Sequence, residues 1–143
     1  MAGNVRIAGY HCFDDWHMEL VGYKADYPEV ERVTVKVPGR DGELDITDNL
    51  YGRTIYGNRK ITLQMENHEV EIGDSFAEFE TKILSEVHGV RGQIIFDDDP
   101  GFYFIGLIQV KALNDNEGIW EMEIEVDADP YKYLISDPTQ KTL

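Results

Sequence analysis

Apolar and polar residues alternate at every second position over several stretches of this chain, and this period of two limits the folds open to it. The alternation runs through residues 31–37, 60–66 and 120–127. A period of two is typical of β-strands with one face against a core and the other toward water or a partner. The sequence therefore predicts a chain built mainly from short strands.

A single stretch shows helical spacing instead. Between about Ser75 and His88, apolar side chains recur three or four residues apart, which is typical of a helix with one buried face. Ser75 and Glu78 fit a capping box at its start, and Gly89 can adopt the left-handed conformation that ends a helix. We expect this helix to lie flat on a sheet and to face it with two phenylalanines.

Turn residues divide the remaining strands. Pro100-Gly101 suits a type II turn and predicts a hairpin whose second strand, Phe102 to Ile108, lies in the middle of the structure, because it is apolar on both faces near its start. A loop at Asn114 to Gly118 is expected to lead into the last strand. The segment Tyr56 to Arg59 fits either a turn or a bulge.

These elements together favour one fold class. Parallel strands need long crossover connections, usually helices, and one helix cannot supply them. The sequence therefore predicts an antiparallel β sandwich or open barrel with one flanking helix at about Ser75 to His88. The 143 residues fit a single domain, residues 1–143.

Composition narrows the functions. The chain has 13 Lys and Arg against 28 Asp and Glu, a formal net charge of -15, which disfavours binding of nucleic acid through phosphate contacts. No apolar run approaches about 20 residues, so no membrane span is expected. The first ten residues lack the pattern of an export signal, which indicates a cytoplasmic protein. Cys12 is the only cysteine, so it is expected to be a buried small residue rather than half of an internal disulfide.

Signals for catalysis or metal binding are weak. Asp14-Asp15 and Asp97 to Asp99 could supply paired carboxylates, but acids in turns more often solvate the chain and cap backbone donors. We therefore expect no enzyme activity, no cofactor and no metal site. Two sets of possible metal ligands match neither a zinc motif nor a calcium loop: His11, Asp14 and His17, and Asp41, Glu43 and Asp45.

The two most specific motifs lie in the first half of the chain. Val37 to Asp48 reads VPGRDGELDITD, and Tyr56 to Leu63 reads YGNRKITL. These motifs resemble the N-terminal domain of siphophage distal tail proteins, in which a PGRDG-x-LD-[IL]-T segment precedes a YGNR strand. The resemblance continues in order through the helix after Gly73, the turn at residues 95–103 and the VDADPYKY segment at residues 126–133. It spans nearly the whole chain.

The resemblance implies a β sandwich with a flanking helix and a structural role. It implies a hexameric ring that joins the tail tube of a phage or prophage to the tail tip or baseplate. The implied partners are further copies of the chain, the tail tube protein and the tail-tip hub or receptor-binding proteins. The implied location is the virion tail, assembled in the bacterial host cytoplasm. Many relatives carry a second, C-terminal β-sandwich domain, which is expected to be absent because the chain stops at Leu143.

A ring would give the charged residues particular roles. Repeated around a ring, acids on one strand face would form negative bands that repel passing DNA from the wall of a lumen, so that DNA is cargo and is not bound. A solvated outer face is the alternative. The possible lumen-facing acids are Glu121, Glu123, Glu125 and Asp127.

Contacts between subunits can be sought among arginines and tyrosines, which are enriched at interfaces. In so acidic a chain, an arginine is a natural partner for a carboxylate of a neighbour. Pairing within one chain is the alternative. The candidates are Arg40, Asp41, Arg53, Tyr56 and Arg59.

Two other functions stay open at this point. A saccharide-binding module of a tail or prophage adhesin would need an exposed groove containing Trp16, Tyr10 or Tyr23. A hydrolase would need two carboxyl groups from the acidic turns to face each other across a cleft.

Overall fold

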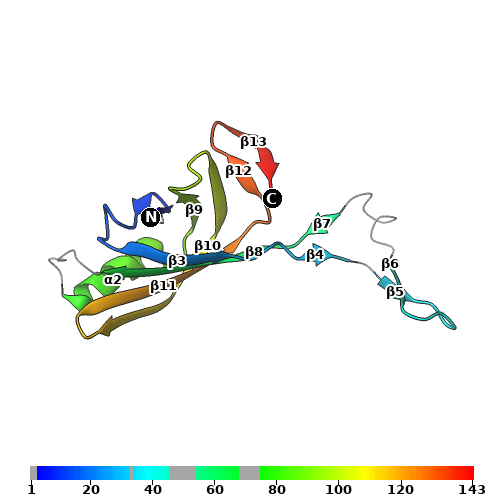
Figure 1. Ribbon diagram of the computed structural model, residues 1–143, viewed down its shortest axis with the longest axis horizontal. Coiled ribbons are helices and arrows are strands. Elements are labelled where there is room, and N and C mark those ends of the chain that lie inside the picture. The colour runs from blue at the N-terminus through cyan, green and yellow to red at the C-terminus, as the bar shows by residue number, and fades with distance from the viewer. Residues whose placement is uncertain (1–2, 33, 46–53, 68–74) are drawn as a thin grey trace.

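The computed structural model describes residues 3–32, 34–45, 54–67 and 75–143 (Figure 1). Strands dominate these residues, and the helix among them is α2 (Phe76–Val87). The strands are β1 (Val5–Ile7), β2 (Tyr10–His11), β3 (Glu19–Ala25), β4 (Val30–Glu31), β5 (Thr34–Lys36), β6 (Glu43–Asp45), β7 (Ile55–Tyr56), β8 (Arg59–Asn67), β9 (Arg91–Phe96), β10 (Phe102–Asn116), β11 (Ile119–Ala128), β12 (Lys132–Leu134) and β13 (Asp137–Thr142).

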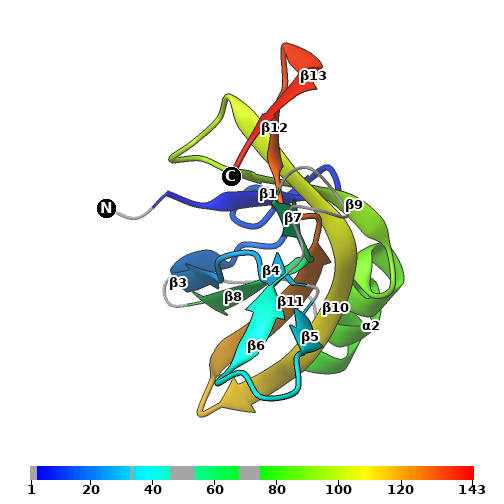
Figure 2. The same cartoon turned by 90° about the vertical axis from the view of Figure 1, so that its right-hand side faces the viewer.

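Most of the strands belong to one antiparallel sheet. Its order is β2-β1-β9-β10-β11-β8-β3, with β12 paired to the start of β10 and β13 paired to β12. Two separate ribbons pair β4 with β7 and β5 with β6. The large sheet curls strongly, and the described strands do not close it into a barrel (Figure 2). The prediction of a mainly β, antiparallel fold with one flanking helix is confirmed.

Short contacts join β3, at one end of the sheet order, to the region of β1 and β9. The side-chain oxygen of Asn4 accepts a hydrogen bond from the backbone N–H of Leu20 at 3.1 Å. The rings of Tyr23 and Phe96 lie 4.5 Å apart. These contacts help to hold the curled sheet around its core, whose fully buried side chains include Ile7, Ile61, Leu63, Ile94, Ile108, Ile124 and Val126.

The helix forms where the sequence predicts it. The Ser75 hydroxyl accepts a hydrogen bond from the Glu78 N–H, which satisfies one free donor at the helix start. Gly89 follows the helix with φ of 81°. One side of α2 is buried in the core, and the ring of Phe79 lies 5.1 Å from that of Trp120 on β11.

Two strands with the same sequence pattern have different surroundings. The strand predicted at residues 60–66 lies within β8, and its three apolar side chains are buried. The half-buried strand predicted at residues 31–37 is wrong, because Val35 and Val37 are 40% and 38% exposed. The chain forms β4 and then β5 there, in ribbons separate from the large sheet.

The hairpin between β9 and β10 forms as predicted, but its turn has another geometry. A type II turn needs positive φ at its third residue, and Gly101 does not have it. The Phe102 N–H donates to the Asp99 carbonyl at 3.3 Å across the turn. The prediction that the following strand is central is confirmed, because β10 lies between β9 and β11.

Two other connections differ from the predictions. The loop expected at Asn114 to Gly118 is reduced to Glu117 and Gly118, which have φ of 52° and 89° and suit a tight hairpin turn between twisted strands. The segment Tyr56 to Arg59 is neither a turn nor a bulge, because Gly57 and Asn58 lie in no turn and outside the paired strands on either side. It carries the chain directly from β7 into β8.

Candidate assembly surfaces

A narrow extension projects from the body of the molecule (Figure 1). It consists of the ribbon β4–β7 and, farther out, the ribbon β5–β6, which together we call the arm. The turn between β5 and β6 contains Gly39 and Gly42 with φ of 81° and 74°, a conformation that glycine adopts without strain. Its Arg40 N–H donates to the Val37 carbonyl at 3.2 Å.

The predicted interface residues are spread along this arm and its base. Arg40 and Asp41 are exposed in the turn at the far end. Tyr56 lies in β7, where its ring meets that of Tyr131 edge to face at 6.1 Å. Arg53 lies outside the described residues. The candidates in the described part of the chain therefore do not form one continuous patch.

Arg59, the fifth candidate, is 6% exposed and is used within the chain. Its Nε donates to the carbonyl of Asp26 at 2.9 Å, and its Nη1 donates to the carbonyls of Pro130 and Leu143 at 3.3 and 3.1 Å. The guanidinium also lies 5.3 Å from the ring centre of Phe104. Burial lowers the pKa of Arg59. A guanidinium occupied in this way is a structural clamp, so we do not carry Arg59 into an interface.

The acidic face predicted for residues 120–127 is present on β11. Glu121, Glu123 and Glu125 are half-buried and Asp127 is exposed, whereas the residues between them turn into the core. The pairing of strands extends this charge, because Glu121 lies opposite Glu66 of β8.

Charges on this acidic face are unevenly distributed. Glu66 is also paired with Glu19 of β3, so three carboxylates occupy neighbouring positions at one end of the face. Toward the other end, the Lys60 ammonium lies 3.5 Å from the Glu125 carboxylate. A shallow hollow of about 250 Å³ lies at the acidic end, lined in part by Gln64, Asn114 and Glu123. Like charges on facing strands destabilise the isolated sheet, and they give this surface a negative potential.

The acidic turns considered for catalysis lie close together but hold the chain in place. The His11 ring nitrogen Nε2 lies 3.0 Å from the Asp97 carboxylate, and the His11 N–H donates to the Asp15 carboxylate at 2.7 Å. The Asp99 carboxylate accepts from Lys132 at 2.7 Å. These contacts give Asp15, Asp97 and Asp99 structural roles in the folded chain. The described residues contain no group of three side chains suited to a metal ion.

Cys12 lies beneath the same turns and is fully buried, as expected. Removal of the thiol from water raises the pKa of Cys12 to about 11. A neutral, buried thiol is a poor nucleophile.

Trp16 is not available for the exposed aromatic groove that a saccharide-binding module would need. Trp16 is buried, and its indole N–H donates to the Glu86 carboxylate of α2 at 3.0 Å. The ring of Tyr10 covers it, with the ring centres 6.0 Å apart. Tyr23 is half exposed but rests on Phe96. We therefore do not carry the groove further.

Among the described residues, no helix is both long enough and apolar enough to span a bilayer.

Comparison with known proteins shows that this chain is similar in fold to a solved protein structure. No protein-family model matches the chain, and no curated protein matches it. The virion of a native gene transfer agent particle aligns with a TM-score of 0.37 and 12% identity, covering 75% of this chain and 78% of that one. The crystal structure of the SPP1 Dit protein aligns with a TM-score of 0.72 and 14% identity.

The SPP1 protein is described as a paradigm of the hub adsorption apparatus in phages that infect Gram-positive bacteria. The alignment covers 94% of this chain and 53% of that protein. This chain therefore spans about half the length of the SPP1 protein and shares its fold over nearly all of its own residues.

Proposed function

We propose that this chain is a structural subunit of a phage or prophage tail that forms a hexameric ring between the tail tube and the tail tip or baseplate. The observation that carries the proposal is the fold shared with SPP1 Dit over 94% of the chain. The motifs at residues 37–48 and 56–63 point to the same family independently of that fold. The role is structural rather than catalytic, because the acidic turns are engaged in contacts that hold the fold.

The arm supports assembly with other copies. It extends away from the body, and both Val35 of β5 and Val37, which follows that strand, are exposed. Narrow ribbons leave backbone donors and acceptors open along their edges, which favours pairing with another chain. In a ring, such an arm would lie against the neighbouring subunit and cover these groups.

The acidic face supports an inner wall along which DNA passes. Glu121, Glu123 and Glu125 repeated in each subunit would give the lumen a negative potential, and DNA would meet repulsion instead of adhesion. In this proposal the partners beyond the ring are the tail tube protein and the hub or receptor-binding proteins. The site is the virion tail, after assembly in the host cytoplasm.

Electron microscopy of the purified chain, combined with a variant of the acidic face, tests both parts of the proposal. The expected result is a six-fold ring whose central hole is lined by β11. Larger or smaller side chains on β11 should then narrow or widen that hole. The triple substitution Glu121→Lys, Glu123→Lys and Glu125→Lys should leave the ring intact and make it retain DNA in a gel-shift assay at low salt. Wild-type rings should let the DNA run free.

A matched control replaces three exposed acids that lie outside β8, β10, β11 and the arm, Asp14, Glu78 and Asp98, by lysine, with the same change of charge. Equal retention of DNA by both triple variants would show that net charge decides the result, and would contradict a lumen lined by β11. Absence of rings in the wild-type protein under all conditions would contradict the ring itself.

A further inference from the structure

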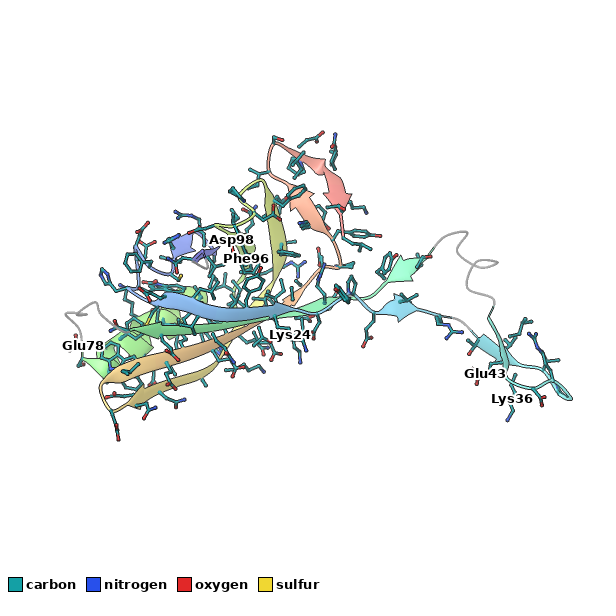
Figure 3. The ribbon with its side chains drawn as sticks, viewed as in Figure 1. Lys24, Lys36, Glu43, Glu78, Phe96 and Asp98 are labelled. Atoms are coloured by element: carbon teal, nitrogen blue, oxygen red, sulfur yellow. The ribbon has the colours of Figure 1, made fainter. Side chains whose placement is uncertain are left out.

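A hollow of about 730 Å³ lies where the arm joins the body, and we call it the root hollow. Figure 3 shows this junction between the labelled Lys24, on the body, and the far hairpin that carries Lys36 and Glu43. The aromatic residues considered above for a saccharide groove do not line it. Its lining includes Tyr27, Glu29, Glu31, Tyr56, Asn58 and Arg59.

Two tyrosines border the root hollow. Tyr27 is 90% exposed, so packing within the described chain leaves its ring almost uncovered. A large aromatic ring exposed to this degree gains nothing from burial and is typical of a surface that contacts a ligand. The ring of Tyr56 meets that of Tyr131 edge to face at 6.1 Å, which holds it in place. The hollow therefore offers one open aromatic ring beside a second, supported one.

Two carboxylates at the hollow are open to a ligand. A Cβ atom at Gly57 would lie 3.5 Å from Oε1 of Glu31 and 3.8 Å from the Cβ of Glu29. Both acidic side chains therefore lie over the same glycine, whose missing side chain leaves room for a ligand. Glu29 and Glu31 are exposed, and neither carboxylate has a hydrogen bond or ion pair within the described part of the chain. Each can accept hydrogen bonds from a ligand.

Arg59 brings donors to the same hollow. The residue is 6% exposed, and backbone carbonyls take its Nε and Nη1 groups. No acceptor among residues 3–32, 34–45, 54–67 and 75–143 binds its Nη2, which carries two N–H groups. A donor on a side chain this deeply buried is costly when it stays without a partner. The amide of Asn58 adds two more N–H groups and one acceptor.

The charges around the hollow disfavour a simple ion. The Asp26 and Glu125 carboxylates at its rim each lie 3.5 Å from a lysine ammonium, so they are already neutralised in part. A small anion would meet the open carboxylates of Glu29 and Glu31, and a small cation would meet the guanidinium of Arg59. A neutral ligand that both donates and accepts hydrogen bonds avoids both penalties.

We propose that the root hollow binds a neutral saccharide. The C–H face of one sugar ring stacks on Tyr27, and its hydroxyl groups donate to Glu29 and Glu31. Other hydroxyl oxygens accept from Nη2 of Arg59 and from the amide of Asn58. An aromatic surface with a few well-placed polar groups is the usual composition of a small-ligand site. This site adds a binding activity to the proposed structural role, and it does not depend on the ring.

An extended peptide is the alternative ligand, because its backbone also donates and accepts. A peptide needs apolar pockets for alternate side chains as well as hydrogen bonds. The hollow is lined mainly by charged and amide groups around the tyrosines, which suits hydroxyl groups better.

Titration of the purified chain with oligosaccharides is the first test. The probes are four neutral, linear tetrasaccharides, built from glucose, galactose, rhamnose or N-acetylglucosamine, and the method is isothermal titration calorimetry. At least one probe should bind. Tyr27→Ala should weaken that binding by about tenfold or more, whereas Tyr27→Phe, which keeps the ring, should stay within about threefold of the wild-type affinity. Because Tyr27 is exposed, neither substitution should change the midpoint of thermal unfolding.

Removal of the carboxylates is the second test. Glu29→Ala with Glu31→Ala should weaken binding of the same probe by about tenfold, because hydrogen bonds to charged acceptors are lost. The matched control removes two exposed acids elsewhere, Glu78→Ala with Glu117→Ala, and should leave the affinity unchanged. Binding of the neutral probe should also be the same at low and high salt. Equal losses in both double variants would contradict a site at the hollow.

The remaining outcomes each decide the proposal. Absence of binding by all four probes at about 10 mM would overturn it. Binding of tetramethylammonium or of an unstructured peptide through Tyr27, without binding of a saccharide, would also overturn it. Binding that disappears as the chain assembles would mean that the hollow belongs to a contact between subunits, and would overturn the site as well. Monomers that bind a saccharide would support the site and contradict only the ring.

Discussion

At the scale of single residues, Arg59 has the clearest task. Its guanidinium binds carbonyl oxygens from residues 33, 71 and 84 positions away in the sequence. The planar group with several fixed donors suits this arrangement better than an ammonium would. Through it, the end of β3, the segment before β12 and the end of the C-terminal ribbon are joined at the base of the arm.

Replacement of Arg59 by methionine tests this clamp. Arg59→Met keeps an unbranched stem near Phe104 but removes the donor to three partly buried backbone oxygens, and the loss of partners for such polar groups is destabilising. We expect a loss of about 2–4 kcal/mol in the free energy of unfolding, measured by denaturant titration. Lys60→Met, at the exposed neighbour, should cost less than about 1 kcal/mol. Equal effects of the two substitutions would contradict the clamp.

The buried thiol of Cys12 makes stability fall at high pH. Its pKa is raised to about 11 in the folded chain from the ordinary value of 9.0. The unfolded chain therefore loses this proton first, and the free energy of unfolding should decrease from about pH 9 toward pH 11. The slope should reach about 1.4 kcal/mol per pH unit at most. Unfolding titrations at several pH values measure it.

The Cys12→Ala variant is the control for this pH dependence. It is less stable at every pH, because it leaves space in the core, but its stability should decline less between pH 8.5 and 10.5. Parallel curves for the two proteins would show that the thiol does not carry the effect.

At the scale of elements, the pairing of β10 with β11 depends on a close backbone approach at Gly106. A Cβ atom at this position would lie 2.3 Å from the backbone oxygen of Asp127 and 2.6 Å from the Cα of Ala128. Backbone atoms in the middle of a sheet cannot move away cheaply. Glycine is therefore required here for space rather than for an unusual φ.

Gly106→Ala should destabilise the chain by about 3 kcal/mol or more, because it pushes the two central strands apart. The measurement is the midpoint of thermal unfolding by circular dichroism. Gly22→Ala on β3 is the control, because an added Cβ there meets nothing nearer than the Gln64 side chain at 3.8 Å. A Gly106→Ala protein with the wild-type midpoint would contradict the packing described for β10.

Sequence periodicity predicts elements well where the partner surface lies inside the same chain. The strand at residues 60–66 and the helix from Ser75 are correct, because their apolar faces meet the core. The same alternation at residues 31–37 shows only that one face is apolar, and on that face Val35 and Val37 are exposed in the isolated chain. Turn geometry at Gly101 also depends on the strands around it, which local composition does not reveal.

For a similar reason, some residues of the candidate surfaces could be predicted from the sequence and others could not. The acidic face follows directly from the alternation on β11, so Glu121 and Glu123 are where the sequence places them. Arg59 could not be assigned, because its acceptors are distant in sequence. The burial of Trp16 against Glu86 is likewise a long-range contact, and no local pattern marks it.

At the scale of the whole molecule, the body and the arm have different roles in this account. The curled sheet and α2 enclose one core of buried apolar side chains. The arm has few apolar contacts with that core and exposes its valines. A surface of this kind has little use in an isolated subunit, and it gains one when a neighbouring copy covers it.

The central claim is that this chain builds a ring, and its mass in solution tests that claim most directly. Light scattering coupled to size-exclusion chromatography, across a tenfold range of concentration, measures the mass of the assembled species. The account predicts a species of six subunits, six times 16.4 kDa, that dissociates when the arm is shortened by replacing residues 29–57 with a tight turn. A protein that stays monomeric at every concentration, with or without its arm, would contradict it.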